Sequence, residues 1–333
     1  MRVGTGDHTY EWQEDWAQIP DTESARTGWA HSGVAVAASG DVITFHPGDP
    51  VLMVFGADGH LKQQVESQAA AAHGMCLVQE PGAEYLWVAD NGARRQPTAG
   101  YEYRPARGPQ VLKLDLNGRT AQSMEKPDLP AYVDGKYSPT SVAVFESRFG
   151  GNGDVWVADG YGSHYVHRYS ASGDYLGSIN GEEGRAGKFN CPHGVYVDRR
   201  RSEPELYVAD RGNHRVQVYD LDGTWRRAFG EDFMTTPSGF AADGDDLVVA
   251  ELRARLTVLD GNDRLVTYLG ENEPVCTTPG WPNEKNAAGE PVRTSQLQPG
   301  KFNSPHGMAI DAAGNLYVAE WLIGGRFIRL EKV

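Results

Sequence analysis

Cysteine is scarce in this sequence, and long apolar runs are missing. The 333 residues include three cysteines at wide spacing, Cys76, Cys191 and Cys276. An odd, scattered set argues against a disulfide framework and favours a reducing compartment. No stretch approaches the roughly 18 apolar residues of a membrane-spanning helix, and the N-terminus shows no secretory pattern. We therefore expect a cytoplasmic protein with no membrane partner.

Positive charge is also in short supply. Lysine and arginine together number 31 against 45 aspartates and glutamates, which gives a formal net charge of −14. An acidic surface repels phosphate backbones, so nucleic acid is not an expected partner. We expect a small-molecule substrate as the partner, and the composition leaves the oligomeric state open.

Turn-forming residues, in contrast, are abundant, with 40 glycines and 19 prolines. They separate short apolar strands in a repeat whose clearest copy runs from Cys191 to Gly230. One four-stranded unit cannot bury both of its faces, so the units must stack radially and close. The sequence predicts an all-β, six-bladed β-propeller in a single domain, residues 1–333. The predicted blades lie at about 29–62, 70–125, 137–181, 188–230, 235–271 and 300–333.

The two ends of the chain predict how the ring closes. The last repeat has about three strands, and a strand-like segment at about 9–19 precedes the first repeat. We expect this N-terminal strand to complete blade 6, because closure leaves only short protected edges. Two insertions, 96–109 and 272–298, break the repeat, and the sequence assigns no role to the second.

Histidine recurs at one position of the repeat, just before the first strand. Alternate blades of a six-bladed ring are related by rotations of about 120°, so histidines on every second blade converge on the axis. Such a set suits a metal ion with three protein nitrogens and one open position. Around the ring this position reads Ser32, His73, Thr140, His193, Ser238 and His306.

The sequence therefore predicts a metal site at His73, His193 and His306. A repeat-consensus histidine that caps a turn is the alternative, but it should also occur in blades 1, 3 and 5, where hydroxyl residues stand. Three neutral imidazoles and a water suit Zn²⁺, and other divalent transition metals also accept imidazole. Cys191 could be a soft ligand, although we interpret it as a small buried residue.

The end of the second strand is another shared position, and it is mostly acidic. An acidic residue there commonly fixes the following turn. The residues just beyond it vary between blades, which favours a role in a pocket. We predict Tyr161 as a general base or acid and Arg211 as a carboxylate-binding cation. The predicted substrate-binding residues at or beyond these strand ends are His46, Arg253, Glu320 and Trp321.

The repeats resemble the NHL family, and more closely its peptidyl-α-hydroxyglycine α-amidating lyase branch. The motifs behind the resemblance are AHGM at Ala72–Met75, DGYGSHYV at Asp159–Val166, FNCPHGV at Phe189–Val195, VADRGNHRVQVY at Val208–Tyr219 and FNSPHGM at Phe302–Met308. The resemblance implies catalytic zinc on His73, His193 and His306, Tyr161 as the base and Arg211 as a pocket residue.

Two positions depart from that lyase pattern. Pro47 replaces an arginine that the lyases need, and Gly307 replaces an aspartate that helps to hold a structural calcium ion, so Ca²⁺ is not an expected cofactor. We expect a zinc-dependent lyase, or a hydrolase or hydratase, that acts on a small hydroxy or carbinolamide-type substrate. The alternative is a non-catalytic propeller that binds a ligand or a protein through its loops.

Overall fold

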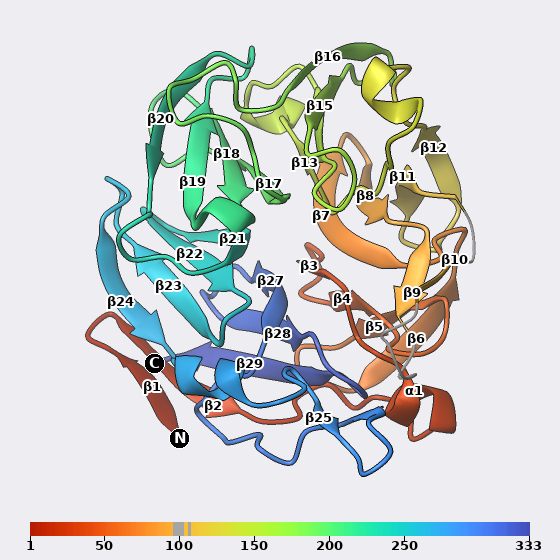
Figure 1. Cartoon of the computed structure of the whole chain (residues 1–333), viewed down its shortest axis with the longest axis vertical. Coiled ribbons are helices and arrows are strands. Elements are labelled where there is room, and N and C mark those ends of the chain that lie inside the picture. The colour runs from red at the N-terminus through yellow and green to blue at the C-terminus, as the bar shows by residue number, and fades with distance from the viewer. Residues whose placement is uncertain (96–102, 106–107) are drawn as a thin grey trace.

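The computed structural model describes residues 1–95, 103–105 and 108–333, and it shows six antiparallel sheets arranged around a central axis (Figure 1). Residues 96–102 and 106–107, which belong to the first predicted insertion, lie outside this description. The predicted six-bladed β-propeller is thus confirmed.

Five blades are four-stranded and the sixth has five strands. Blade 1 contains β3 (Val34–Val36), β4 (Val42–Phe45), β5 (Val51–Phe55) and β6 (Leu61–Glu66). Blade 2 contains β7 (Ala72–Glu80), β8 (Ala83–Asp90), β11 (Gln110–Asp115) and β12 (Thr120–Met124). Blade 3 contains β13 (Ser141–Val144), β14 (Val155–Ala158), β15 (Val166–Tyr169) and β16 (Tyr175–Ile179).

Blade 4 contains β17 (Pro192–Asp198), β18 (Glu205–Asp210), β19 (Arg215–Tyr219) and β20 (Trp225–Phe229). Blade 5 contains β21 (Pro237–Asp243), β22 (Asp246–Glu251), β23 (Arg255–Leu259) and β24 (Leu265–Leu269). Blade 6 contains β27 (Pro305–Ile310), β28 (Leu316–Glu320), β29 (Arg326–Lys332), β2 (His8–Gln13) and β1 (Arg2–Thr5).

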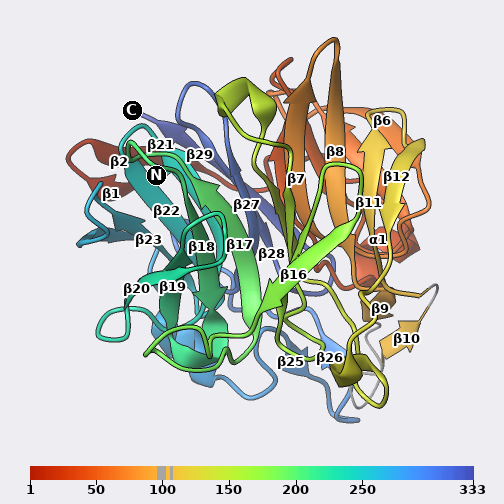
Figure 2. The same cartoon turned by 90° about the horizontal axis from the view of Figure 1, so that it is seen from above.

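The connections contain the remaining short elements. They are α1 (Glu23–Thr27), the 3₁₀ turns η1 (Pro130–Tyr132), η2 (Ser147–Phe149), η3 (Arg211–Asn213) and η4 (Glu273–Thr277), and the strands β9 (Ala93–Arg95), β10 (Tyr103–Pro105), β25 (Glu284–Lys285) and β26 (Pro291–Val292). Figure 2 shows β9, β10, β25 and β26 together on one side of the blades, which we call the loop face. Among the described residues, no helix has the length and apolar character needed to cross a membrane.

The hydrophobic core lies between the blades. The second strand of each blade is buried on both faces, because a neighbouring blade packs against each side. These strands therefore read as continuous apolar runs, such as Leu206–Ala209, which is fully buried. Six clusters of buried residues fill the six interfaces between neighbouring blades.

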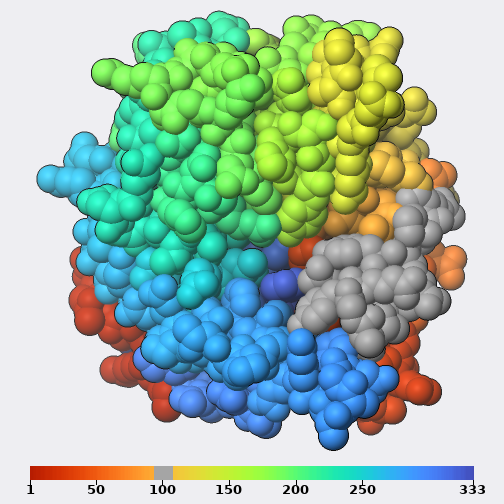
Figure 3. Space-filling model, viewed as in Figure 1, coloured from red at the N-terminus to blue at the C-terminus, as the bar shows by residue number. Residues whose placement is uncertain are grey.

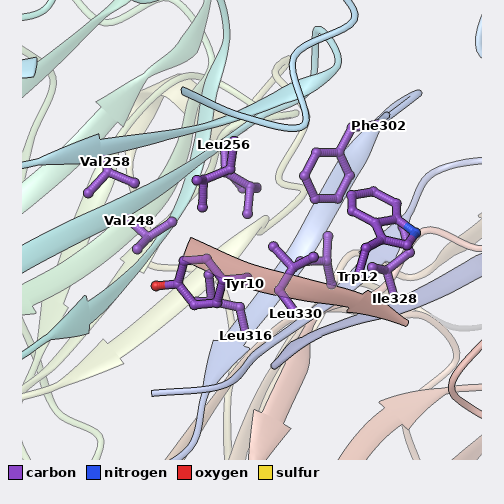
Figure 4. Packing of buried hydrophobic residues seen from close by; sticks show 12 residues of the cluster. Tyr10, Trp12, Val248, Leu256, Val258, Phe302, Leu316, Ile328 and Leu330 are labelled. Carbon is purple, nitrogen blue, oxygen red and sulfur yellow. The ribbon is translucent and has the colours of Figure 1, made fainter. Parts of the chain in front are cut away.

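The N-terminal strand closes the ring as predicted. Strand β2 pairs antiparallel with β29, with Trp12 opposite Leu330. Figure 4 shows Tyr10 and Trp12 of this strand packed among residues of blades 5 and 6, and the Trp12 and Phe302 ring centroids are 4.8 Å apart. The strand is shorter than predicted. Strand β1, which the sequence analysis missed, folds back on β2 as a hairpin.

Arg326 ties the N-terminal segment to blade 6. Its buried guanidinium donates to both carboxylate oxygens of Glu14, at 2.5 and 2.8 Å, and to Glu320 at 3.0 Å. It also donates to the carbonyl oxygens of Gln298 and Lys301. Each of the three guanidinium nitrogens of Arg326 thus donates to an acceptor, as a buried charge requires.

Arg326→Met should lower the stability of the protein by about 3–5 kcal/mol, because Glu320 would remain as a buried charge without its cation. Denaturant unfolding followed by tryptophan fluorescence measures the change. Arg264→Met is the matched control, since its exposed ion pair with Asp260 contributes at most about 1 kcal/mol. Equal unfolding midpoints for the two variants would contradict this role of Arg326.

Candidate metal centre on the propeller axis

The structure brings His73, His193 and His306 together at the axis. They lie in the innermost strands β7, β17 and β27, and all three side chains are buried. The centroid of the His73 ring is 4.9 Å from that of His193 and 4.6 Å from that of His306, and the remaining pair is 5.1 Å apart.

A break in strand register aims each of these rings. Pairing with the second strand skips one residue in each blade, between Ala72 and Gly74, between Pro192 and Gly194, and between Pro305 and Gly307. The skipped residue is the histidine itself. Such bulges re-aim a side chain, and here they coincide with the position at which the chain reaches the axis.

The next blade fixes the orientation of each ring. The Nδ1 atoms of His73, His193 and His306 lie 2.7, 2.9 and 3.2 Å from backbone carbonyl oxygens of the blade that follows. A carbonyl only accepts, so Nδ1 carries the proton and Nε2 has a free lone pair. This is the arrangement of histidines that bind metals. The three carbonyls belong to Thr140, Ser238 and Ser32, the residues that alternate with histidine in the sequence.

The glycine after each of these histidines makes that approach possible. A Cβ on Gly74 would lie 2.3 Å from the Thr140 carbonyl oxygen, and a Cβ on Gly307 would lie 2.3 Å from that of Ser32. Any side chain would push the neighbouring blade away and break the bond to the imidazole. The same contact explains why an aspartate cannot occupy position 307 without a shift of blade 1.

The imidazoles are neutral, as a metal site requires. Burial lowers the pKa of His306 to about 3 and lowers the pKa of His73 and His193 well below the ordinary value. The Nε2 atoms of His73 and His306 are 3.1 Å apart. Two nitrogens bound to one tetrahedral zinc ion at about 2.0–2.1 Å would be roughly 3.3 Å apart. The spacing of the His73 and His306 nitrogens therefore fits a single ion.

Tyr161 lies at the centre of the cluster. Its hydroxyl oxygen is 3.3 Å from His73 Nε2, 3.1 Å from His193 Nε2 and 3.5 Å from an Arg211 guanidinium nitrogen. Arg211 also donates to Cys191 Sγ at 3.2 Å. The structure thus brings both residues predicted as catalytic to the predicted metal ligands.

The sequence analysis missed His31. Its Nε2 is 3.2 Å from the Tyr161 hydroxyl, and its ring centroid is 4.5 Å from those of His73 and His306. The ligand atoms of His31, His73 and His306 all lie within 4.8 Å of one another. The alignment of repeats selected Ser32 in blade 1, and the imidazole precedes it by one residue. A histidine directly beside the aligned serine was therefore the sequence signal for this further imidazole.

Of the predicted substrate-binding residues, Trp321 lies beside the cluster and Glu320 does not. The Trp321 ring centroid is 5.7 Å from that of His31. Glu320 is fully buried, and its oxygens accept from the backbone N–H groups of Asn303 and Ser304 and from Arg326. These contacts give Glu320 a structural role, because they fix the position of the loop that leads into β27.

His46 and Arg253 lie outside the cluster. His46 is buried, and its Nδ1 accepts from the backbone N–H groups of Gly48 and Asp49. Its ring and His31 line one small cavity of about 30 Å³. Arg253 is partly exposed, 3.6 Å from Glu273 of η4 in the predicted 272–298 insertion. Their role in substrate binding stays a prediction.

Space is available on both sides of the histidines. On the loop face the surface is hollowed at its centre, and the bottom of the hollow is formed by atoms from the first and last parts of the chain (Figure 3). On the other side, a cavity of about 350 Å³ follows the innermost strands of all six blades, with Met75, Val195 and Arg199 in its wall.

A buried polar chain supports the loop of Tyr161. Asp159 accepts from the backbone N–H groups of Ser138 and Ser163 and from the Tyr132 hydroxyl, at 2.6–2.7 Å. His167 Nε2 lies 2.7 Å from the same hydroxyl oxygen. Because the hydroxyl proton is used on Asp159, the imidazole must be the donor in this second contact.

The buried hydrogen bonds between Asp159, Tyr132 and His167 make the stability of the protein depend on pH. Burial lowers the pKa of His167 to about 3, whereas an unfolded histidine titrates near about 6.5. The unfolded chain therefore binds a proton that the folded chain does not, and stability falls as the pH drops from about 6.5 towards 3. His167→Gln should lose less stability over this interval, which unfolding midpoints at several pH values would show. The exposed control His60→Gln should keep the wild-type slope, and parallel curves for all three proteins would contradict the assignment.

The fold and the buried cluster define a class, that of six-bladed propellers with several histidines on the axis. Residues 189–219 match the NHL repeat model. Mouse NHL repeat-containing protein 3 is 30% identical over 236 residues, which cover 68% of this chain and 61% of that protein. Peptidyl-alpha-hydroxyglycine alpha-amidating lyase 1 of Drosophila melanogaster is 25% identical over 343 residues, 94% of this chain and 58% of that protein. The chain spans about three fifths of the length of these relatives.

Solved propellers share the fold. A streptogramin B lyase structure superimposes with a TM-score of 0.58 at 13% identity and covers 97% of both chains. A gluconolactonase of Xanthomonas campestris gives 0.58 at 14% identity, with 99% of this chain and 94% of the other covered. At this identity the likeness is one of architecture. The chain is a six-bladed propeller in which residues 189–219 match an NHL repeat, and it is similar in sequence to the amidating lyases and to NHL repeat-containing proteins.

Proposed function

We propose that the protein is a metal-dependent lyase that cleaves a small carbinolamide-type hydroxy compound on the propeller axis. The observation on which this depends is the convergence of neutral, oriented imidazoles on the hydroxyl of Tyr161. The homology to amidating lyases supports the reaction class.

His73, His193 and His306 would hold the ion through Nε2. Zn²⁺ is our first choice, because three neutral imidazoles leave one position open. When bound, the ion would act as a Lewis acid that stabilises negative charge on the substrate oxygen.

Tyr161 would move the proton. In a carbinolamide, the hydroxyl and the amide nitrogen share one carbon. The Tyr161 oxygen would take the hydroxyl proton while the carbonyl forms and the carbon–nitrogen bond breaks, and it would then return the proton to the leaving nitrogen. The Arg211 guanidinium, 3.5 Å away, would stabilise negative charge on the Tyr161 oxygen.

Arg211 also favours an acidic substrate. Its guanidinium is engaged by Tyr161 and Cys191 in the site and could bind a carboxylate beside the reacting carbon. An N-acyl-α-hydroxyglycine carries a hydroxyl group, an amide nitrogen and a carboxylate on one carbon. Its cleavage gives an amide and glyoxylate. It is therefore the substrate we would test first.

His193→Ala should abolish stoichiometric metal binding without unfolding the protein. Elemental analysis after zinc loading and dialysis should find about one equivalent in the wild type and much less in the variant, because an imidazole ligand is lost. His60→Ala, an exposed histidine in blade 1, is the control. A wild type without bound transition metal would refute the proposed mechanism.

Tyr161→Phe should lower kcat for glyoxylate release from an N-acyl-α-hydroxyglycine by roughly 100-fold or more, with the metal retained, because it removes only the proton-transfer group. Tyr165→Phe changes a tyrosine that stacks on His167 and should keep wild-type turnover. Full activity in Tyr161→Phe would exclude this tyrosine as the base.

A binding scaffold is the second candidate, and one observation favours it. The position of the lyase arginine holds Pro47, which lines the small cavity beside His31 and His46. A scaffold should capture its partner equally well with and without His193, whereas the proposed lyase should lose turnover in His193→Ala.

A further inference from the structure

Blade 1 contributes a fourth imidazole to the cluster. His31 lies against His73 and His306 on the side where the hydroxyl of Tyr161 also lies. His193 meets the same two rings, with centroid distances of 4.9 and 5.1 Å. His73 and His306 are therefore shared by two histidine triads, one completed by His193 and the other by His31.

We propose that His31 is a fourth metal ligand, so that the site is a four-histidine centre rather than a three-histidine centre with an open position. This inference rests on the proposed function, because it concerns the same ion. It replaces the open position with His31, so the substrate oxygen would displace this imidazole or bind as a fifth ligand. It goes beyond the family resemblance, which implies ligands in blades 2, 4 and 6 only.

The distances favour a ligand over a residue that merely contacts Tyr161. The ligand atoms of His31, His73 and His306 lie within 4.8 Å of one another, and in the described part of the chain these three form the group of potential ligands within that limit. A hydrogen bond to Tyr161 alone would not require the His31 ring to pack against two other imidazoles.

The local backbone fixes His31 at this place. The carbonyl of the next residue, Ser32, accepts from His306 Nδ1. Gly33 follows, and a Cβ there would lie 2.9 Å from the backbone nitrogen of Met75. One short segment of blade 1 therefore orients a ligand of blade 6 and presents its own imidazole to the same ion.

A fourth imidazole has a chemical consequence. Four nitrogen ligands satisfy the tetrahedral preference of Zn²⁺ without solvent, as in closed sites. His31 would therefore compete with the substrate oxygen for one position. His31→Ala should bind the metal more weakly and leave a position that a small external ligand can fill.

The first test uses the wild-type protein loaded with zinc alone. X-ray absorption at the zinc edge counts imidazole ligands through their multiple-scattering pattern. Four imidazoles are expected, and three imidazoles with one oxygen would overturn the proposal. This measurement needs no variant, so it does not depend on whether a substitution folds.

The second test compares wild type, His31→Ala and the exposed control His60→Ala. Zinc affinity, measured by chelator competition, should fall in His31→Ala by at least the roughly 10- to 100-fold that an outer-shell substitution costs. With Co²⁺, its visible bands should weaken and shift, and added imidazole should restore them. Wild-type affinity and spectra in His31→Ala would overturn the proposal.

The outcomes separate this inference from the proposed function. A wild type that binds no metal refutes both. A wild type that binds metal with four imidazoles but releases no glyoxylate refutes only the lyase. A metal-bound, active wild type whose His31→Ala variant is unchanged refutes only the fourth ligand.

Discussion

The contact between neighbouring blades at the axis is the constraint on which the candidate site depends. Each of the three axial histidines donates Nδ1–H to a backbone carbonyl of the next blade, at 2.7–3.2 Å. Glycine must follow the histidine, because a Cβ would collide with that carbonyl. The spacing of the three imidazoles, their tautomer and their orientation therefore all follow from the packing of the innermost strands. No single blade could provide them, so the cluster forms only when the ring is assembled.

One of these contacts spans the closure of the ring. His306 of blade 6 donates to Ser32 of blade 1, and the two residues are 274 positions apart in the chain. Blade 6 is itself completed by β2 and by the ion pairs of Arg326 with Glu14 and Glu320. The stability of the N-terminal strand and the geometry of the cluster are thus coupled physically, because Glu320, the ion-pair partner of Arg326, lies opposite Pro305, the residue before His306. Of the three axial histidines, His306 is the one whose carbonyl partner lies across the closure of the ring.

Features that recur in every blade can be predicted from the sequence, whereas a feature that occurs in a single blade cannot. The blade number, ring closure and the meeting of His73, His193 and His306 follow from periodicity, because equivalent positions of a closed ring face the axis. The acidic residue of the second strand is also periodic, and in blades 2 to 6 it accepts backbone N–H groups of the loop before the first strand, as Asp90 and Glu320 show. His31 was missed because it stands one residue outside the repeated position, and periodicity says nothing about a side chain that reaches the axis from a unique loop.

Blade 1 departs from the repeat at several places that lie close together. It has His46 in place of the acidic residue, Pro47 in place of the lyase arginine, and His31 before its axial serine. His31, His46 and Pro47 all line one small cavity. Under the proposed function, the ligands of blades 2, 4 and 6 and Tyr161 retain the lyase pattern. Of the departures, Pro47 and the added His31 lie in blade 1, and Gly307 lies in blade 6. Blade 1 therefore has an uncharged ring where the resemblance implies a cation, and an imidazole where the resemblance implies none.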